Sequence, residues 1–134
     1  WVEFSPDGQR VATASNDGNV RVWDVTTGAS LAGFSHGSEV VTAQFSPDGQ
    51  RLMTGNSENS LRVWDSHTGR LLSAPLQHGG LIWSARFSPD GQSVVTASAD
   101  RTARLWDLRP GGALGTAQRG LACAETAMGR AAGC

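Results

Sequence analysis

Three residues in the second half of the chain are the types that carry out hydrolysis: His78, Ser98 and Asp100. In a hydrolase triad the histidine activates the serine for nucleophilic attack, and the aspartate orients the histidine. Such a serine must be exposed beside a pocket whose groups can stabilise an oxyanion. Ser98 instead falls in an expected β-strand, with Trp106 as its natural neighbour. We therefore expect the trio to be structural and the chain to have no catalytic residues.

Metal-binding chemistry also finds no support in the spacing of the residues. His36, His67 and His78 are far apart, and no second histidine or cysteine lies at the spacing of a zinc ligand pair. The segment 16–19, Asn-Asp-Gly-Asn, lacks the alternating acids and the distal glutamate of a calcium loop, so we interpret it as a hairpin turn. The sequence predicts neither a metal nor a cofactor.

Charge and composition narrow the class of partner. The chain of 134 residues has 11 basic and 12 acidic residues and a net charge of −1, so no broad basic surface favours nucleic acid or an anionic membrane. No apolar run approaches the ~20 residues of a membrane helix. Cys123 and Cys134 lie outside every repeated segment and form no disulfide framework. A cytoplasmic location is favoured.

The elements that position these residues recur along the chain. Phe-Ser-Pro-Asp-Gly starts at Phe4, Phe45 and Phe87, and Trp-Asp follows each copy at a constant distance, at Trp23, Trp64 and Trp106. The copies are about 41 residues apart, a period typical of propeller blades. Short β-branched runs alternate with turn residues inside each unit, which predicts antiparallel strands joined by hairpins.

The second unit shows the expected strands most clearly. We predict strands at 40–46, 51–56, 60–66 and 71–77, with Ser-Pro-Asp-Gly as the turn between the first two. Both sides of the third strand carry bulky residues, which favours a sheet packed between neighbouring sheets. Pro75 removes a ladder donor, so the fourth strand should be the outer edge.

The chain therefore divides into units of unequal completeness. We expect a partial blade at 1–35, a complete blade at 36–77, a blade with a degenerate last strand at 78–118, and an Ala/Gly-rich, disordered tail at 119–134. The fold class is all-β: a β-propeller segment of three four-stranded antiparallel blades, of which the first and last are incomplete.

These motifs resemble the WD-repeat β-propeller family over roughly residues 1 to 108. The resemblance implies a structural hydrogen-bonded chain of a histidine, a Ser or Thr late in the second strand, an Asp in the next turn and the strand-three Trp. The third unit would use His78, Ser98, Asp100 and Trp106; the first would use Ser15, Asp17 and Trp23. The second has His36 and Trp64, but Asn56 and Glu58 replace the Ser and the Asp, so we expect a looser second blade.

The resemblance also places partner contacts on the rim formed by the loops before the first strand and after the second. The matching positions are Glu39, Val41, Leu81, Trp83, Asn16, Ser57, Ala99 and Arg101. Trp83 and Arg101 are of the residue types in which binding energy concentrates. An alternative for Trp83 is packing against a neighbouring blade.

The function that we expect is a non-catalytic scaffold for protein partners, built from WD repeats and forming a fragment of a larger propeller. Closure by the remaining blades of a longer chain is favoured over self-association, because three blades leave two sheet faces uncovered. The alternative is a regulatory arm of a bacterial multidomain Ser/Thr kinase or ATPase, since segment 68–78 is similar to repeats of such proteins. A propeller enzyme is disfavoured, because the expected inner strands offer only Gln44 and Arg86 as isolated functional groups.

Overall fold

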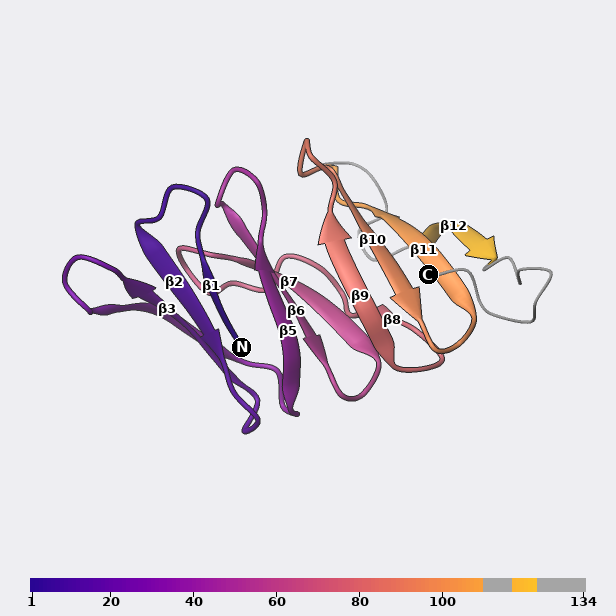
Figure 1. The fold of residues 1–134 in the computed structure, drawn as a ribbon, viewed down its shortest axis with the longest axis horizontal. Helices are drawn as coiled ribbons and strands as arrows, with labels where there is room; N and C mark the ends of the chain where they lie inside the picture. Colours follow the sequence, from indigo (N-terminus) through magenta and orange to yellow (C-terminus); the bar gives the residue numbers. More distant parts are fainter. Residues whose placement is uncertain (110–116, 123–134) are drawn as a thin grey trace, which may run out of the picture.

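The computed structural model describes residues 1–109 and the backbone of 117–122, and these residues form three antiparallel sheets. Figure 1 shows the sheets side by side in chain order. The first sheet contains β1 (Val2–Phe4), β2 (Arg10–Ala14), β3 (Asn19–Asp24) and β4 (Ser30–Ser35). The second contains β5 (Val40–Phe45), β6 (Arg51–Asn56), β7 (Ser60–Asp65) and β8 (Leu76–Gln77). The third contains β9 (Ile82–Phe87), β10 (Ser93–Ser98), β11 (Thr102–Asp107) and β12 (Ala117–Ala122).

Each sheet is a meander in which consecutive strands are neighbours. The Phe-Ser-Pro-Asp-Gly block makes the first hairpin turn of every sheet, and its glycine has a φ of +70° to +72° in all three copies. The serine hydroxyl of the block bonds the aspartate carboxylate two residues later, for example Ser46 to Asp48 at 2.6 Å. The sequence repeat is therefore a repeat of turn geometry.

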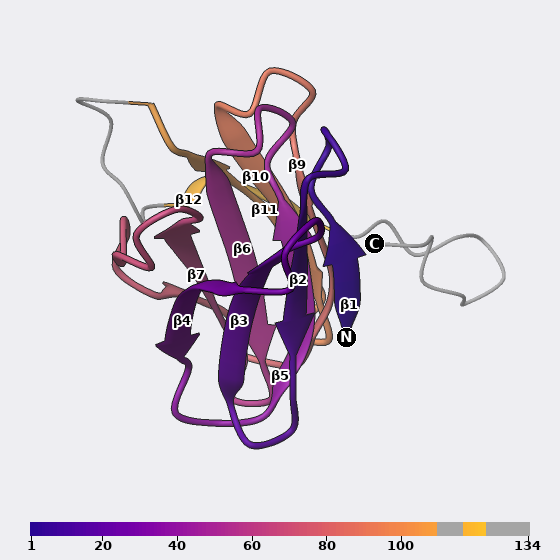
Figure 2. The same ribbon diagram turned by 90° about the vertical axis from the view of Figure 1, so that its left-hand side faces the viewer.

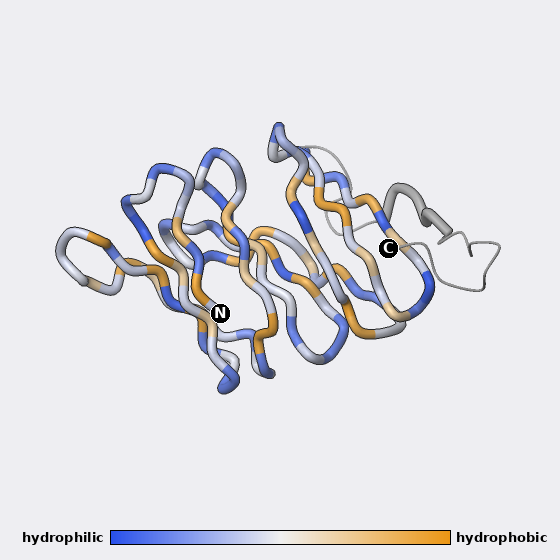
Figure 3. The backbone as a smooth tube through the Cα atoms, in the orientation of Figure 1, coloured by the Kyte–Doolittle hydropathy of each residue, from blue (hydrophilic) through white to orange (hydrophobic). Residues whose placement is uncertain are grey.

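The three sheets stack face to face, as the end-on view shows (Figure 2). One apolar cluster fills the space between the first two sheets and includes Val20, Val22 and Phe45. A second cluster between the second and third sheets includes Met53, Leu61 and Trp106. Hydrophobic residues follow the strands, and hydrophilic residues gather at the turns (Figure 3). This stacking confirms the all-β propeller segment that the sequence predicts.

An arginine joins the turns of neighbouring sheets. Arg10 on β2 is buried, and its guanidinium donates to the carbonyl of Gly49 at 2.6 Å and to the hydroxyl of Ser66 at 2.9 Å. It also lies over the ring of Phe45, 5.4 Å from the centroid. Arg51, at the same place on β6, donates to Gly91 of the third sheet at 3.2 Å. The same contact thus connects both pairs of sheets, and it is more extensive between the first two.

The fourth strand of the second sheet is shorter than the sequence predicts. β8 comprises only Leu76 and Gln77, and a single bridge between Leu71 and Trp64 precedes it. The intervening residues, 73–75, leave the ladder. Pro75 accounts for the interruption, because it has no N–H to donate to β7.

The fourth strand of the third sheet lies later in the chain than expected. β12 pairs along most of β11, from Thr102 opposite Ala122 to Trp106 opposite Ala117. The expected boundary between blade and tail at residue 118 therefore falls inside a strand. Backbone pairing does not need an apolar period, which is why composition alone missed this strand. The remaining residues of the expected disordered tail, 123–134, lie outside the described residues, as do 110–116.

Candidate functional site

The trio His78, Ser98 and Asp100 is brought together at the start of the third sheet, but it is not arranged as a catalytic triad. His78 is buried, and its Nδ1 lies 2.9 Å from the Asp100 carboxylate. Its Nε2 lies 2.6 Å from the hydroxyl of Thr96, not from that of Ser98. The Ser98 hydroxyl donates to the carbonyl of Gly80 at 2.9 Å. Ser98 has no base beside it and cannot act as an activated nucleophile through His78.

Thr96 is the hydroxyl that connects the histidine to the tryptophan. The indole Nε1 of Trp106 donates to its Oγ1 at 3.0 Å. The resemblance to WD repeats implied Ser98 for this place, and Ser98 lies on the same face of β10. Two residues along a strand are roughly 7 Å, too far for a bond to the same two rings. A threonine also takes this place in the other two sheets, where Thr13 and Thr54 accept from the tryptophan indoles at 2.9 and 2.8 Å.

A signal for these threonines is present in the sequence. A threonine lies ten residues before the tryptophan in all three units. The serine position, by contrast, holds Ser15 and Ser98 in the first and third units but Asn56 in the second. In the first unit Ser15 bonds Asp17, whereas the Trp23 indole donates to Thr13.

Asp100 closes the chain of hydrogen bonds in the third sheet. Burial alone would raise the pKa of its carboxyl, but bonds from Thr102, His78 and the backbone N–H of Gly79 outweigh burial and hold that pKa well below its usual value. The carboxylate is therefore charged when the sheet is folded. It fixes both the turn before β11 and the orientation of the His78 ring.

In the second sheet, different residues hold the turn between β6 and β7. The side-chain oxygen of Asn56 accepts from the backbone N–H groups of Glu58 and Ser60 and from the Ser60 hydroxyl, so Asn56 holds the turn. His36 donates through Nε2 to the carbonyl of Thr54 at 3.3 Å, and its buried Nδ1 has no partner. Burial lowers the pKa of His36. Because Nε2 donates to a carbonyl, Nδ1 of the neutral ring is an acceptor that has no donor among the described residues.

The described residues contain no group of His, Cys, Asp and Glu side chains that could hold a metal ion. His67 is exposed in the turn after β7, away from the two buried histidines. None of these residues forms a helix long and apolar enough to cross a membrane.

The eight residues expected on the rim are all exposed. In the third sheet the backbone N–H of Ala99 donates to the carbonyl of Leu81 at 2.8 Å, and in the second sheet that of Ser57 donates to Glu39 at 3.0 Å. These bonds bring the loop before the first strand against the turn after the second. The two loops of each sheet therefore share one end, as a rim requires.

Three of the rim residues line one pocket of about 350 Å³ across the inner strands. Val41 comes from β5, Leu81 directly precedes β9, and Trp83 is the second residue of β9 with 61% of its surface exposed. Trp1 and Arg86 also line the pocket, although neither is among the binding residues that the sequence predicts. No signal marks Trp1, because the matching positions of the other units hold Thr42 and Ser84. The remaining rim residues, Glu39, Asn16, Ser57, Ala99 and Arg101, do not line it.

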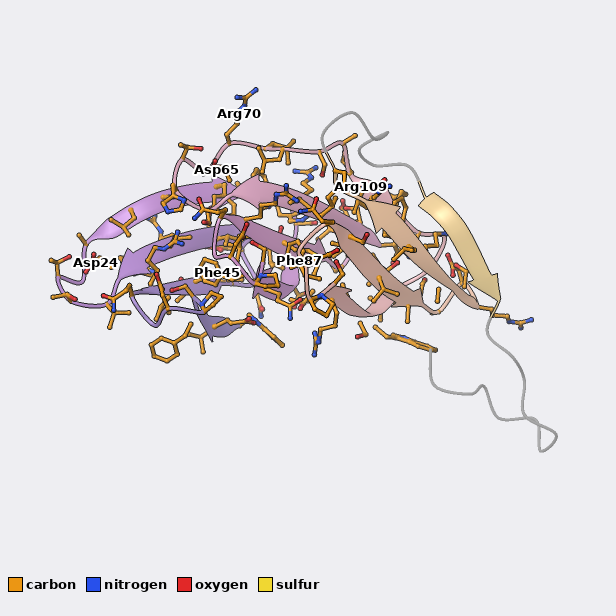
Figure 4. All side chains as sticks on the ribbon, turned by 90° about the horizontal axis from the view of Figure 1, so that it is seen from above. Asp24, Phe45, Asp65, Arg70, Phe87 and Arg109 are labelled. Atoms are coloured by element: carbon orange, nitrogen blue, oxygen red, sulfur yellow. The ribbon has the colours of Figure 1, made fainter. Side chains whose placement is uncertain are left out.

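Side chains lie between the sheets along the whole stack (Figure 4). The pocket is lined from three strand regions: Trp1 before β1, Val41 and Thr42 of β5, and residues 81–86 at β9. Apolar walls with a few polar groups are typical of binding sites. The pocket contains no cluster of acids or histidines: Arg86 is its one titratable side chain among the described lining residues. This arrangement can hold a side chain of a partner, and it offers no general acid or base pair.

The repeats match the family model described as WD domain, G-beta repeat at residues 1–24, 28–65 and 69–107. The chain belongs to the WD40 repeat family. Each of the two later matches starts before the last strand of one sheet and ends in the third strand of the next. A WD40 repeat therefore spans two sheets, which connects neighbouring sheets covalently.

Two curated relatives share single segments with this WD40 chain. Periodic tryptophan protein 2 of Saccharomyces cerevisiae is 61% identical over 31 residues, which are 23% of this chain and 3% of the relative. The Periodic tryptophan protein 2 homolog of Dictyostelium discoideum is 43% identical over 42 residues, 31% of this chain and 5% of the relative. Both are eukaryotic, so the expectation of bacterial-type repeats stays a prediction.

A solved structure extends the likeness to almost the whole fold. The computationally designed Ika8 protein matches with a TM-score of 0.75 and 30% identity, over 90% of this chain and 35% of that chain. This WD40 chain thus spans about a third of the designed protein's length.

Proposed function

We propose that this WD40 chain is a non-catalytic scaffold that binds partner proteins through the pocket on its inner strands. The exposure of Trp83 at this pocket carries the proposal. Trp64 and Trp106 are buried in the stack, whereas Trp83 and its neighbour Leu81 present apolar surface to solvent. Aromatic side chains of this kind commonly supply the largest contributions at protein interfaces.

The second part of the proposal is that the three sheets form an arc of a longer propeller. Phe34 stacks on Trp64, with 4.5 Å between the ring centroids, and so covers the second sheet. Trp23 holds the same place in the first sheet and is only half-buried, while Val2 and Phe4 on that side are more than 60% exposed. A further sheet laid on this face would bury them. The regulatory-arm hypothesis stays a prediction, since it depends on sequence outside this chain.

Peptide selection tests the binding proposal. A phage-displayed library of random peptides would be selected on the immobilised chain, and the affinity of the recovered peptides would be measured by isothermal titration calorimetry. We expect Trp83→Ala to weaken binding by about 30-fold, the effect of removing an interface anchor of ~2 kcal/mol. Circular dichroism would verify that the variant is folded.

A matched pair of leucines provides the control. Leu81 and Leu71 are 45% and 42% exposed, but only Leu81 lines the pocket. Leu81→Ala should weaken the recovered peptides and Leu71→Ala should not. Peptides that bind both variants and Trp83→Ala as tightly as the parent would overturn the proposal.

A further inference from the structure

Arg101 occupies a backbone position that disfavours its side chain. The turn between the second and third strands has a residue of positive φ in every sheet: Gly18 at 85°, Asn59 at 68° and Arg101 at 69°. Glycine adopts this conformation freely and asparagine tolerates it, but a long side chain does so at an energetic cost. The backbone conformation of this turn therefore does not favour arginine. We look for the role of Arg101 in its charged side chain.

The guanidinium of Arg101 is free to bind. Arg101 is exposed, and no carboxylate of the described residues lies within ion-pair distance of it. The neighbouring acid in the chain has other partners: Asp100 bonds His78 at 2.9 Å and the backbone N–H of Thr102 at 2.8 Å. A solvent-exposed cation without a carboxylate is available to an anionic group of a partner.

The turn that carries Arg101 lies against Leu81, a residue that lines the apolar pocket. The turn is fixed against the start of β9, because Ser98 pairs with Ile82 in the ladder and Ala99 donates to Leu81 at 2.8 Å. The next residues along β9 are Trp83 and, further on, Arg86, which line the pocket. The only hydrogen bond described for the Arg86 guanidinium is to the carbonyl of Ala85, at 2.9 Å. The third sheet thus contributes Arg86 to the pocket and Arg101 to the turn that adjoins its Leu81 end.

The charges on the other side have the opposite sign. Glu39 precedes β5 at the position that Leu81 occupies in the third sheet, and Glu3 lies on β1 within electrostatic reach of Arg86. A carboxylate on the bound partner is therefore favoured only toward the third sheet. An apolar side chain beside it would fill the space between Val41 and Trp83.

We propose that the pocket takes an acidic segment of a partner protein, with a bulky apolar side chain against Trp83 and a carboxylate on Arg101. This inference rests on the proposed function, because it specifies the chemistry of the partner that binds at the same surface. Apolar contacts with Trp83 alone would not discriminate between acidic and basic segments, whereas the positive charge of Arg101 would.

Three synthetic peptides test the proposal with the full chain. Each has a central leucine within glycine and serine residues, and the leucine is flanked by two glutamates, two glutamines or two lysines. Titration into the ¹⁵N-labelled chain would be followed through the indole N–H signal of Trp83, assigned by its loss in Trp83→Phe. We expect the glutamate peptide to bind about tenfold more tightly than the glutamine peptide and the lysine peptide to bind least.

Two variants at the same turn position separate charge from backbone effects. Arg101→Gly removes the guanidinium and leaves the positive φ with its preferred residue, so it should remain folded and bind the glutamate and glutamine peptides equally. Asn59→Gly makes the matched change in the second sheet and should keep the tenfold preference.

The outcomes distinguish this inference from the proposed function. Equal binding of the glutamate and glutamine peptides by the parent chain, both at Trp83, would overturn the acidic preference and leave the binding surface standing. A preference that persists in Arg101→Gly would also overturn it. If none of the peptides moved the Trp83 signal, the acidic preference would fall, and the phage selection would decide separately whether the surface binds other peptides.

Discussion

Thr96 connects two aromatic rings of the third sheet through one hydroxyl group. The Trp106 indole donates to Oγ1 at 3.0 Å, and His78 Nε2 lies 2.6 Å from the same atom. In the neutral histidine tautomer that donates from Nδ1 to Asp100, Nε2 accepts the threonine proton. The four side chains then form one directed chain of hydrogen bonds between the strands.

Loss of this hydroxyl should cost more in the third sheet than in the second. Thr96→Val keeps the shape but leaves two buried ring nitrogens without a partner, so we expect the free energy of unfolding to fall by about 2–4 kcal/mol. Thr54→Val is the matched control, because within residues 1–109 Thr54 Oγ1 accepts only from Trp64, and His36 bonds the backbone carbonyl. It should cost about 1–2 kcal/mol. Urea denaturation would measure both, and equal losses would contradict this account of the network.

The sequence predicted the participants in this network only in part. The histidines, Asp100 and the tryptophans occupy the places that the resemblance to WD repeats implies for them. The threonines were missed because a strand period of two puts Thr96 and Ser98 on the same face, and the pattern alone does not say which of them the rings reach. Trp1 was missed because no other unit has an aromatic residue at its position.

The second sheet shows how one substitution changes the role of its neighbours. Asn56 stands at the place of Ser98 and takes over the turn contacts that Asp100 makes in the third sheet. Glu58 stands at the place of Asp100 and has no described bond to His36. The turn is therefore satisfied, while Nδ1 of His36 is buried without a partner. The unsatisfied hydrogen-bonding group is therefore on His36, while the pairing of β6 with β7 is intact.

Restoring the third-sheet residues should stabilise the second sheet. In Asn56→Ser with Glu58→Asp, the shorter carboxylate can accept from Ser60 and from an Nδ1–H of His36, provided that the ring moves its Nε2 from the Thr54 carbonyl to accept from the Thr54 hydroxyl, as His78 does from Thr96. We expect a gain of about 1 kcal/mol in the free energy of unfolding. Glu58→Asp alone should gain less, because Asn56 still holds the turn. Urea denaturation compares the three chains. A double variant less stable than the parent would show that the unpartnered Nδ1 costs nothing.

At the scale of elements, the predicted strands hold where side-chain alternation and turn residues agree. β6 spans the residues expected, and β5 and β7 differ from expectation by one residue at an end. The fourth strands deviate: β8 is short because Pro75 interrupts the ladder, and β12 has no apolar pattern to reveal it. Edge strands pair through the backbone on one side only, so their side chains carry little information about their bounds.

The whole molecule is a stack whose first face is uncovered. Between the sheets, the guanidiniums of Arg10 and Arg51 and two apolar clusters connect every neighbouring pair. On the outer face of the first sheet, Val2 and Phe4 pair with Thr13 and Val11 across the ladder and so share one side. On the second sheet, the equivalent face packs against the first sheet.

The uncovered face of the first sheet should make the chain self-associate in isolation. Val2 and Phe4 are 66% and 63% exposed on one side of β1, and burial of contiguous apolar surface drives association. Light scattering should show a mass that rises with concentration, and Phe4→Lys should lower it at every concentration, because a charge on this face opposes docking. Val25→Lys changes a turn residue of 48% exposure and should leave the mass unchanged. A discrete monomer at all concentrations would mean that the uncovered face needs neither a further sheet nor a second copy.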